Sequence, residues 1–302
     1  MKNIIAVIWD FDKTLIDGYM QDPIFKEYNV EASKFWDEVN SLPQKYKEKG
    51  VTVNKDTIYL NHFLRYVKDG RFSGMTNEKL RSYGKQMNFY PGVLDLFERT
   101  IHLFDDDGIA KELNIKVEHY IVSTGFAEVI KGSKLNEYVS KVWGCELIEE
   151  EDDEHLVSEI GYTIDNTTKT RALFEINKGV NKDEKLSVNS KMDYYQRRVD
   201  FKNMIYIADG PSDVPAFSVI KQRGGATFAI YPKKEGNEKA FEQVEQLREE
   251  GRVDMFAEAD YSKGTLADMW ICHKIRQIRD RLVSEETIKR GVIKDGPTHI
   301  TK

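Results

Sequence analysis

The stretch "AVIWDFDKTLIDG", residues 6–18, joins a short apolar run to two aspartates that stand two residues apart. The run begins at Ile4 and is rich in Ile and Val, which indicates a strand buried on both faces, as in a parallel sheet. Side chains alternate along a strand, so Asp10 and Asp12 at its end would point to the same side. The stretch therefore predicts an α/β fold with a pair of carboxylates at the end of its first strand.

The rest of the chain alternates between strand and helix patterns. Three further runs indicate strands: "IKVEHYIVSTG" (115–125), "NMIYIADGPSD" (203–213) and "GATFAIY" (225–231). Helical patterns lie between and after them, around 93–101, 170–177, 213–222, 238–250 and 266–283. The segment 145–165, with an acidic middle, predicts a hairpin. Strands that alternate with helices predict an α/β fold with a mainly parallel sheet, which binds ligands where its strands end.

Residues 17–88 have a different character, because no strand pattern interrupts them. Apolar residues recur at helical spacing in "EASKFWDEVNSL" (31–42), "DTIYLNHFLRYVKDG" (56–70) and "TNEKLRSYGKQM" (76–87). We therefore expect a helical domain at 17–88, inserted into a core formed by 1–16 and 89–302.

The composition argues against several classes of binding partner. The 302 residues carry a formal net charge of −6, which argues against general attraction to nucleic acid or anionic membranes. The two cysteines, Cys145 and Cys272, have no metal-site spacing and are typical of a reduced, cytoplasmic protein. The first apolar run is too short for a signal peptide, and no run approaches the length of a membrane span. Positive charge for an anionic ligand must then be local.

Polar residues at three further positions supply such chemistry. Ser123 and the amide of Thr124 follow the second strand and suit phosphate oxygens. Lys169 begins a predicted helix and offers one ammonium. Asp209 and Asp213 follow the third strand. Together with the first pair of aspartates, they provide oxygen ligands for a hard cation and a carboxylate nucleophile.

Three of these assignments have rivals. Thr124 competes with the preceding serine, which we prefer because it stands at the strand end. Lys178 or Lys182 competes with Lys169, because lysines are common in this stretch. Asp213 has the alternative role of capping the helix that follows it.

The motifs "DFDKT" (10–14), "STG" (123–125), Lys169 and "DGPSD" (209–213) occur in the order found in the haloacid dehalogenase-like (HAD) superfamily, which the chain resembles over nearly its whole length. The resemblance implies a Rossmann-like core with a helical cap in the so-called C1 position, where residues 17–88 lie. The stretches "IVSTGFAEVIKGS" (121–133) and "ADGPSDVPAF" (208–217) also resemble the phosphoserine-phosphatase-like branch of the superfamily.

The resemblance also implies roles for individual residues. Asp10 would attack phosphorus and form an aspartyl-phosphate. Asp12 would protonate the leaving alcohol and then activate water, and Thr14 would support the turn. Ser123 and the Thr124 amide would bind the transferring phosphoryl group.

The remaining implied roles concern charge. Lys169 would neutralise phosphate charge and steady Asp10. Mg²⁺ would be held by Asp10, the main-chain carbonyl of Asp12 and Asp209, with Asp213 completing or orienting its ligands.

The implied activity is that of a Mg²⁺-dependent phosphatase acting on a small phosphorylated metabolite. Asp12 is consistent with this activity, because transporting ATPases of the superfamily carry threonine there and dehalogenases also lack the aspartate. A phosphomutase acting on a sugar phosphate and an inactive phosphate-ligand binding protein are the alternatives. The sequence does not indicate the oligomeric state.

Lys13 departs from the commonest form of the first motif, in which glycine follows the second aspartate. If the backbone at Lys13 is right-handed, a side chain fits there at little cost, and alternation directs it away from the carboxylates. On that basis Lys13→Gly is expected to keep most activity.

Overall fold

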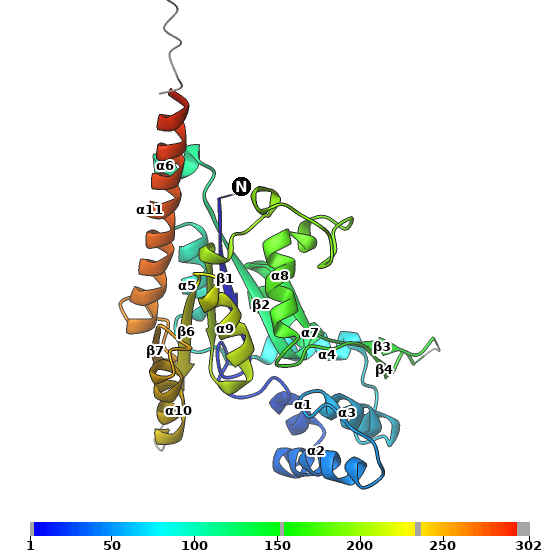
Figure 1. Ribbon diagram of the computed structural model, residues 1–302. Coiled ribbons are helices and arrows are strands. Elements are labelled where there is room, and N and C mark those ends of the chain that lie inside the picture. The colour runs from blue at the N-terminus through cyan, green and yellow to red at the C-terminus, as the bar shows by residue number, and fades with distance from the viewer. Residues whose placement is uncertain (1–2, 152–153, 233–236, 295–302) are drawn as a thin grey trace, which may run out of the picture.

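The computed structural model describes residues 3–151, 154–232 and 237–294. Its centre is a seven-stranded sheet in the order β4-β3-β2-β1-β5-β6-β7 (Figure 1). The strands are β1 (Ile4–Trp9), β2 (Lys116–Phe126), β3 (Val139–Glu149), β4 (Val157–Tyr162), β5 (Met204–Ala208), β6 (Ala226–Tyr231) and β7 (Met255–Glu258). Neighbouring strands are parallel except β3 and β4, which pair antiparallel. The predicted α/β class is confirmed.

Helices precede, connect and follow the strands. They are α1 (Asp22–Glu27), α2 (Ala32–Lys47), α3 (Ile58–Lys68), α4 (Asn77–Tyr83), α5 (Val93–Ile101), α6 (Gly108–Glu112), α7 (Ala127–Lys131), α8 (Lys169–Lys178), α9 (Val214–Gln222), α10 (Glu238–Glu249) and α11 (Leu266–Lys294). Short 3-10 helices lie at Gly84–Gln86, Lys134–Glu137, Val180–Lys182, Tyr194–Gln196, Phe201–Asn203 and Pro211–Asp213. Within the described ranges, none of the helices has the length and apolarity needed to cross a membrane.

Helices cover both faces of the sheet, which explains why every residue of β1 is buried. Figure 1 shows α8 and α9 in front of the strands. Trp9 of β1 and Phe228 of β6 share one register and therefore one face. On that face Phe97 of α5 stacks on Trp9 at 5.0 Å between ring centroids, and Trp270 of α11 stacks on Phe228 at 4.5 Å.

Register at the centre of the sheet brings the predicted motifs to one edge. Trp9 pairs with Ile121 of β2 and with Ile207 of β5. The backbone amide of Asp10 continues the ladder by donating to the Ile207 carbonyl at 2.9 Å. The residues that follow β1 and β5 and the last residues of β2 therefore lie side by side at the carboxyl edge of the sheet.

The predicted hairpin exists, although its tip at 152–153 lies outside the described residues. It is more than a hairpin, because the first part of β3 pairs in parallel with β2 and so joins the main sheet. Strand β7 was not predicted; it has only four residues and carries a charge at its end, so its pattern is weak. Helix α11 runs on to Lys294, past its expected end near residue 283.

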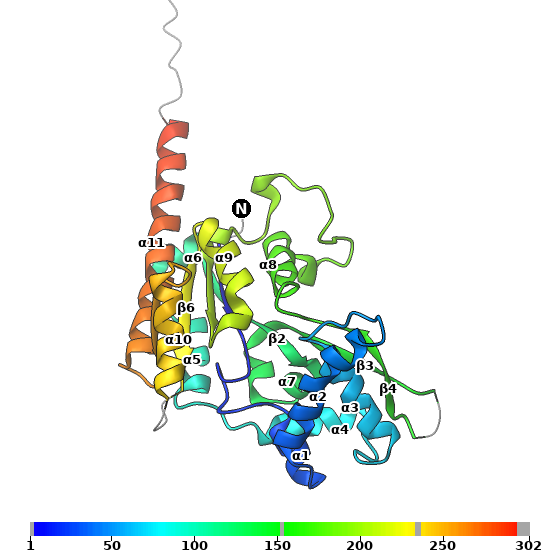
Figure 2. The same ribbon diagram turned by 60° about the horizontal axis from the view of Figure 1, so that its bottom comes forward.

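The predicted helical domain contains α1 to α4. Figures 1 and 2 both place α1, α2 and α3 together at the carboxyl end of β1, beside the β3–β4 hairpin. Phe35 lies at the centre of this group, with its ring centroid 4.9 Å from that of Phe25 and 5.2 Å from that of Tyr66. Helix α4 packs instead against α7, which follows β2. The division at residues 17 and 88 stays a prediction.

Candidate active site

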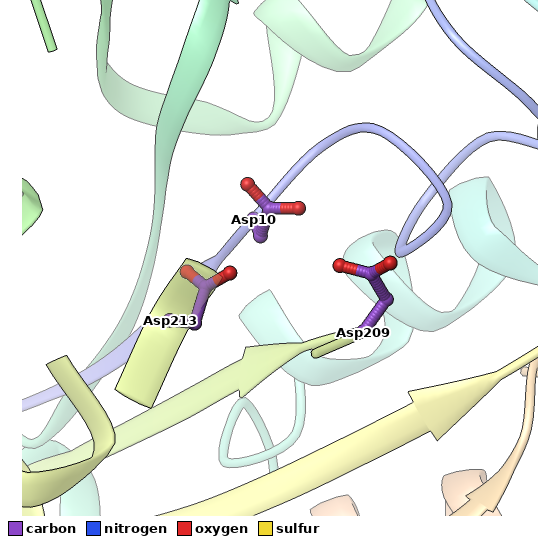
Figure 3. Close-up of side chains that lie close together, drawn as sticks. All are labelled: Asp10, Asp209 and Asp213. Atoms are coloured by element: carbon purple, nitrogen blue, oxygen red, sulfur yellow. The ribbon is translucent and has the colours of Figure 1, made fainter. Parts of the chain in front are cut away.

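Three carboxylates from different elements meet at the carboxyl edge of the sheet. Asp10 follows β1, Asp209 follows β5, and Asp213 ends the 3-10 turn before α9. Each offers an oxygen, and these oxygens all lie within 4.8 Å of one another. Figure 3 shows the three side chains directed toward a common space. The structure thus brings together three of the four aspartates expected to hold a metal through side chain or backbone.

Lys169 joins two of these carboxylates. Its Nζ lies 2.7 Å from Asp10 Oδ1 and 2.7 Å from Asp213 Oδ1. The three side chains are almost fully buried, so neither ion pair is screened by water. Lys178, at the C-terminal end of α8, instead donates to backbone carbonyls of the segment that follows this helix. Lys182 lies beyond the same end, away from the carboxylates at Lys169. Of the three candidates, Lys169 is the one that the fold delivers to the carboxylates.

Asp213 does not cap α9, because its side chain accepts no hydrogen bond from the first turn of that helix. Its Oδ1 accepts a second hydrogen bond, from the Tyr206 hydroxyl at 2.5 Å, and its Oδ2 accepts one from Ser212 at 2.7 Å. Tyr206 was missed by the sequence reasoning. The only signal was a hydroxyl in an otherwise aliphatic strand, three residues before Asp209.

Asp12 lies on the more open side of the cluster and is partly exposed. Its Oδ1 accepts a hydrogen bond from the Met20 amide at 2.8 Å. Gly125 approaches it closely: a Cβ built there would lie 3.4 Å from Asp12 Oδ2 and 2.3 Å from the Met20 Cε. A side chain at residue 125 would therefore displace Met20, and the glycine lets the end of β2 lie beside Asp12.

The two predicted phosphate-binding residues lie within the last part of β2, because this strand runs on to Phe126 and does not end before Ser123 as expected. They differ in exposure. Ser123 is buried, and its Oγ accepts the Gly125 amide at 3.0 Å, which leaves its hydroxyl proton to donate elsewhere. Thr124 is partly exposed, and its carbonyl accepts the Tyr59 hydroxyl of α3 at 2.7 Å. Both lie at the expected edge, and their contact with phosphate stays a prediction.

Thr14 is buried in the turn after the aspartates, as its expected supporting role requires. Its Oγ1 donates to Asp10 Oδ2 at 3.3 Å, and its amide donates to the Phe11 carbonyl at 3.3 Å. Its carbonyl accepts the buried Tyr261 hydroxyl at 2.6 Å. Three hydrogen bonds, made by the side chain, the amide and the carbonyl of Thr14, therefore hold the turn.

The backbone at Lys13 is not right-handed, which contradicts the basis of the expectation from the sequence. Its φ is 58°, in the left-handed region, where a side chain is strained. Its Nζ donates to the Tyr19 hydroxyl at 2.5 Å and lies 4.2 Å from the centre of that ring. Burial alone would lower the pKa of Lys13, but the Tyr19 hydroxyl and the charges of Asp209 and Asp12 raise it. The side chain is thus within the electrostatic reach of the carboxylates.

Burial sets the protonation of the acidic cluster. It raises the pKa of Asp10 to about 6, with Lys169 opposing and Asp213 adding to the rise. It raises the pKa of Asp209 to about 7, assisted by the charges of Asp10 and Asp213. Burial and the Asp10 charge likewise raise the pKa of Asp12 well above its usual range. For Lys169, burial acts to lower the pKa, but the two carboxylates more than offset it and raise the value.

The charge balance fits a divalent cation. Four aspartates converge here, and among the described residues Lys169 is the cation that forms ion pairs with them. The donors of the central group are all carboxylate oxygens, which suit a hard ion such as Mg²⁺. Such an ion would offset both the burial and the mutual repulsion that raise the pKa of Asp10 and Asp209.

Comparison with known proteins gave one sequence relative and structural neighbours. No family model matches the sequence. A protein of Borreliella burgdorferi described as uncharacterized is 40% identical over 297 residues, which cover 91% of this chain and 97% of that protein. A HAD-family hydrolase from Salmonella enterica serovar Typhi matches with a TM-score of 0.50 and 16% identity, over 84% of this chain and 67% of its own. A probable phosphoserine phosphatase from Vibrio cholerae matches with a TM-score of 0.50 and 12% identity, over 91% of this chain and 67% of its own.

Proposed function

This chain belongs to one family with the Borreliella burgdorferi protein and has the fold of HAD-family hydrolases, and we propose that it is a Mg²⁺-dependent phosphatase of a small phosphorylated metabolite. The observation that carries the proposal is the contrast between two carboxylates two residues apart. Asp10 is buried and ion-paired with Lys169, whereas Asp12 is partly exposed and has no ion pair in the described part of the chain. The pair suits a nucleophile beside a general acid.

The protonation states agree with these roles. A pKa of about 6 leaves Asp10 ionised at neutral pH, as a nucleophile must be. Burial and the charge of Asp10 raise the pKa of Asp12 well above its usual range, which is the direction that suits a group giving a proton to a leaving alcohol. The two side chains are chemically identical, and their different surroundings suit them to different roles.

In the proposed reaction, Asp10 attacks phosphorus and the bond from phosphorus to the leaving oxygen breaks. Asp12 gives its proton to that oxygen, and the alcohol departs. Asp12, now ionised, takes a proton from water while the water oxygen attacks phosphorus, and the bond to Asp10 breaks to release phosphate. Lys169 holds Asp10 in position throughout. Mg²⁺ held by Asp10, Asp209, Asp213 and the Asp12 carbonyl would supply positive charge for the phosphate oxygens.

Turnover of p-nitrophenyl phosphate and of a panel of phosphorylated metabolites tests the proposal. We expect turnover with Mg²⁺, none after chelation, and a loss of about 10³-fold or more in Asp10→Asn. Asp37→Asn, on the exposed surface of α2, is the matched control and should keep full activity. Metal-independent turnover, or an active Asp10→Asn enzyme, would contradict the proposal.

Asp12→Asn separates the two half-reactions. p-Nitrophenolate leaves without needing a proton, so Asp10 should still be phosphorylated, but the attacking water has lost its base. We expect a burst of about one equivalent of p-nitrophenolate per enzyme, followed by slow turnover. The absence of a burst at an unchanged steady-state rate would remove Asp12 from its assigned role. Release of inorganic phosphate, rather than a rearranged sugar phosphate, distinguishes hydrolysis from mutase activity.

A further inference from the structure

The backbone at Lys13 is unusual for a lysine. Its φ of 58° lies in a region that glycine adopts freely and that side chains rarely occupy. The loop is closed by the Lys13 amide, which donates to the Gly18 carbonyl at 3.1 Å. Strained residues of this kind persist where the surroundings fix them, and they gather at functional sites. The fold therefore keeps a lysine where glycine would fit with less strain.

The Lys13 side chain lies where the core meets the predicted cap. Its Nζ donates to the hydroxyl of Tyr19, which is 41% exposed. The Tyr19 ring in turn lies 6.0 Å from the ring of Trp36 on α2, measured between centroids. The ammonium is held at the rim of the site by a single neutral hydroxyl and a ring face, both of which an anion can replace.

The open side of the acidic cluster lacks positive charge, and the ammonium of Lys13 can supply it. Lys169 pairs with Asp10 and Asp213, but neither Asp12 nor Asp209 has an ion pair within the described residues. The charges of Asp12 and Asp209 reach Lys13. A phosphate monoester dianion arriving on this side would add two negative charges, so a nearby ammonium favours its binding.

We propose that Lys13 is a substrate-binding residue, whose ammonium leaves the Tyr19 hydroxyl to contact the phosphate ester on the open side of the cluster. This role rests on the proposed phosphatase function. It replaces the expectation that Lys13→Gly keeps most activity, since that expectation assumed a right-handed backbone. A purely structural role, in which Lys13 serves only to hold Tyr19, makes different predictions.

Three substitutions at Lys13 separate charge from backbone strain. Lys13→Gly removes both, Lys13→Gln removes the charge alone, and Lys13→Arg keeps the charge. We expect KM to rise about tenfold to a hundredfold in the first two, with kcat changed much less, and to stay near the wild-type value in the third. Lys13→Gly should also melt at a higher temperature than wild type, because the strain is gone. A more stable protein with weaker substrate binding is not expected of a structural lysine.

Tyr19→Phe tests the structural alternative directly. It removes the hydroxyl that holds Lys13 and leaves the ammonium, so substrate binding should be kept or tightened. If Tyr19→Phe raised KM as much as Lys13→Gly does, the pair would be a structural contact and the proposal would be overturned. Lys26→Gln, on the exposed side of α1, is the matched control for a lost positive charge and should leave KM unchanged.

A binding measurement keeps the test independent of turnover. Inorganic phosphate is titrated calorimetrically into wild type, Lys13→Gly and Lys26→Gln, each with Mg²⁺ present. We expect Lys13→Gly alone to lose about tenfold or more in affinity. Equal affinity in all three proteins overturns the Lys13 proposal even if the phosphatase is active. Weaker binding in Lys13→Gly without any turnover would support Lys13 and refute the phosphatase.

Discussion

The two sides of the acidic cluster are built from the same residue type and differ in their partners. On the buried side, Asp10 and Asp213 share the ammonium of Lys169 at 2.7 Å each. On the open side, Asp12 and Asp209 are partly exposed and have no ion pair in the described ranges. The fold thus neutralises the side that water cannot reach. The open side has no such cation among the described residues, so substitutions on the two sides should differ in their effects.

Removal of the buried cation should have the largest effect. Lys169→Met leaves Asp10 and Asp213 buried without a charged partner, which costs about 3–5 kcal/mol in comparable cases. Urea denaturation without metal measures the change in the free energy of unfolding. Lys26→Met is the matched exposed control and should change it by less than about 0.5 kcal/mol. A loss below about 1 kcal/mol for Lys169→Met would mean that the buried side is not held by this ion pair.

Mg²⁺ should stabilise the folded protein by about 2.7 kcal/mol at a hundredfold excess over its dissociation constant. Asp209→Asn should abolish this gain, because the Asp209 side chain belongs to the group of converging oxygens. Asp12→Asn should keep most of it, because the proposal assigns only the backbone carbonyl of Asp12 to the metal. Thermal melting with Mg²⁺ and with a chelator compares the three proteins. Equal gains in all of them would place the ion elsewhere.

In the metal-free protein, the pH dependence of the free energy of unfolding should reveal the titration of Asp209 on the open side. Folding raises the pKa of Asp209 from 3.8 to about 7, so between these values the folded state binds more protons than the unfolded state. The contribution of Asp209 to stability therefore falls as the pH rises through this window. Asp209→Asn removes this contribution, so its stability relative to wild type should increase by about 2–3 kcal/mol from pH 5 to pH 8. A difference that does not change with pH would contradict the raised pKa.

Tyr206→Phe should have the smallest effect, because Asp213 Oδ1 keeps its ion pair with Lys169 after the hydroxyl is lost. We expect a loss of about 1 kcal/mol in the free energy of unfolding. Tyr195→Phe, at a side chain that is 66% exposed, is the control and should be nearly neutral. A loss as large as that of Lys169→Met would show that the hydroxyl, rather than the ammonium, holds Asp213.

The local parts of the fold were predictable from the sequence. The apolar run Ile4–Trp9 marked the central strand, because a strand covered on both faces has no polar side to alternate with. The antiparallel hairpin was visible in its turn-like acidic middle. Strand β7 and the pairing of β3 with β2 were not, since a short edge strand and a long-range parallel pairing leave little local pattern.

Asp10, Asp209 and Asp213 were identified from the sequence because each follows a strand pattern, and parallel strands end at one edge. That Lys169, 159 residues after Asp10 and 44 before Asp213, ion-pairs with both was decided by the tertiary structure, because only the packing of α8 brings its first residue there. The left-handed backbone of Lys13 was likewise settled by the loop that closes on Gly18, against the local preference of a lysine. Sequence determined which groups are present at the edge of the sheet, and tertiary packing determined which of them are buried, ion-paired or partly exposed.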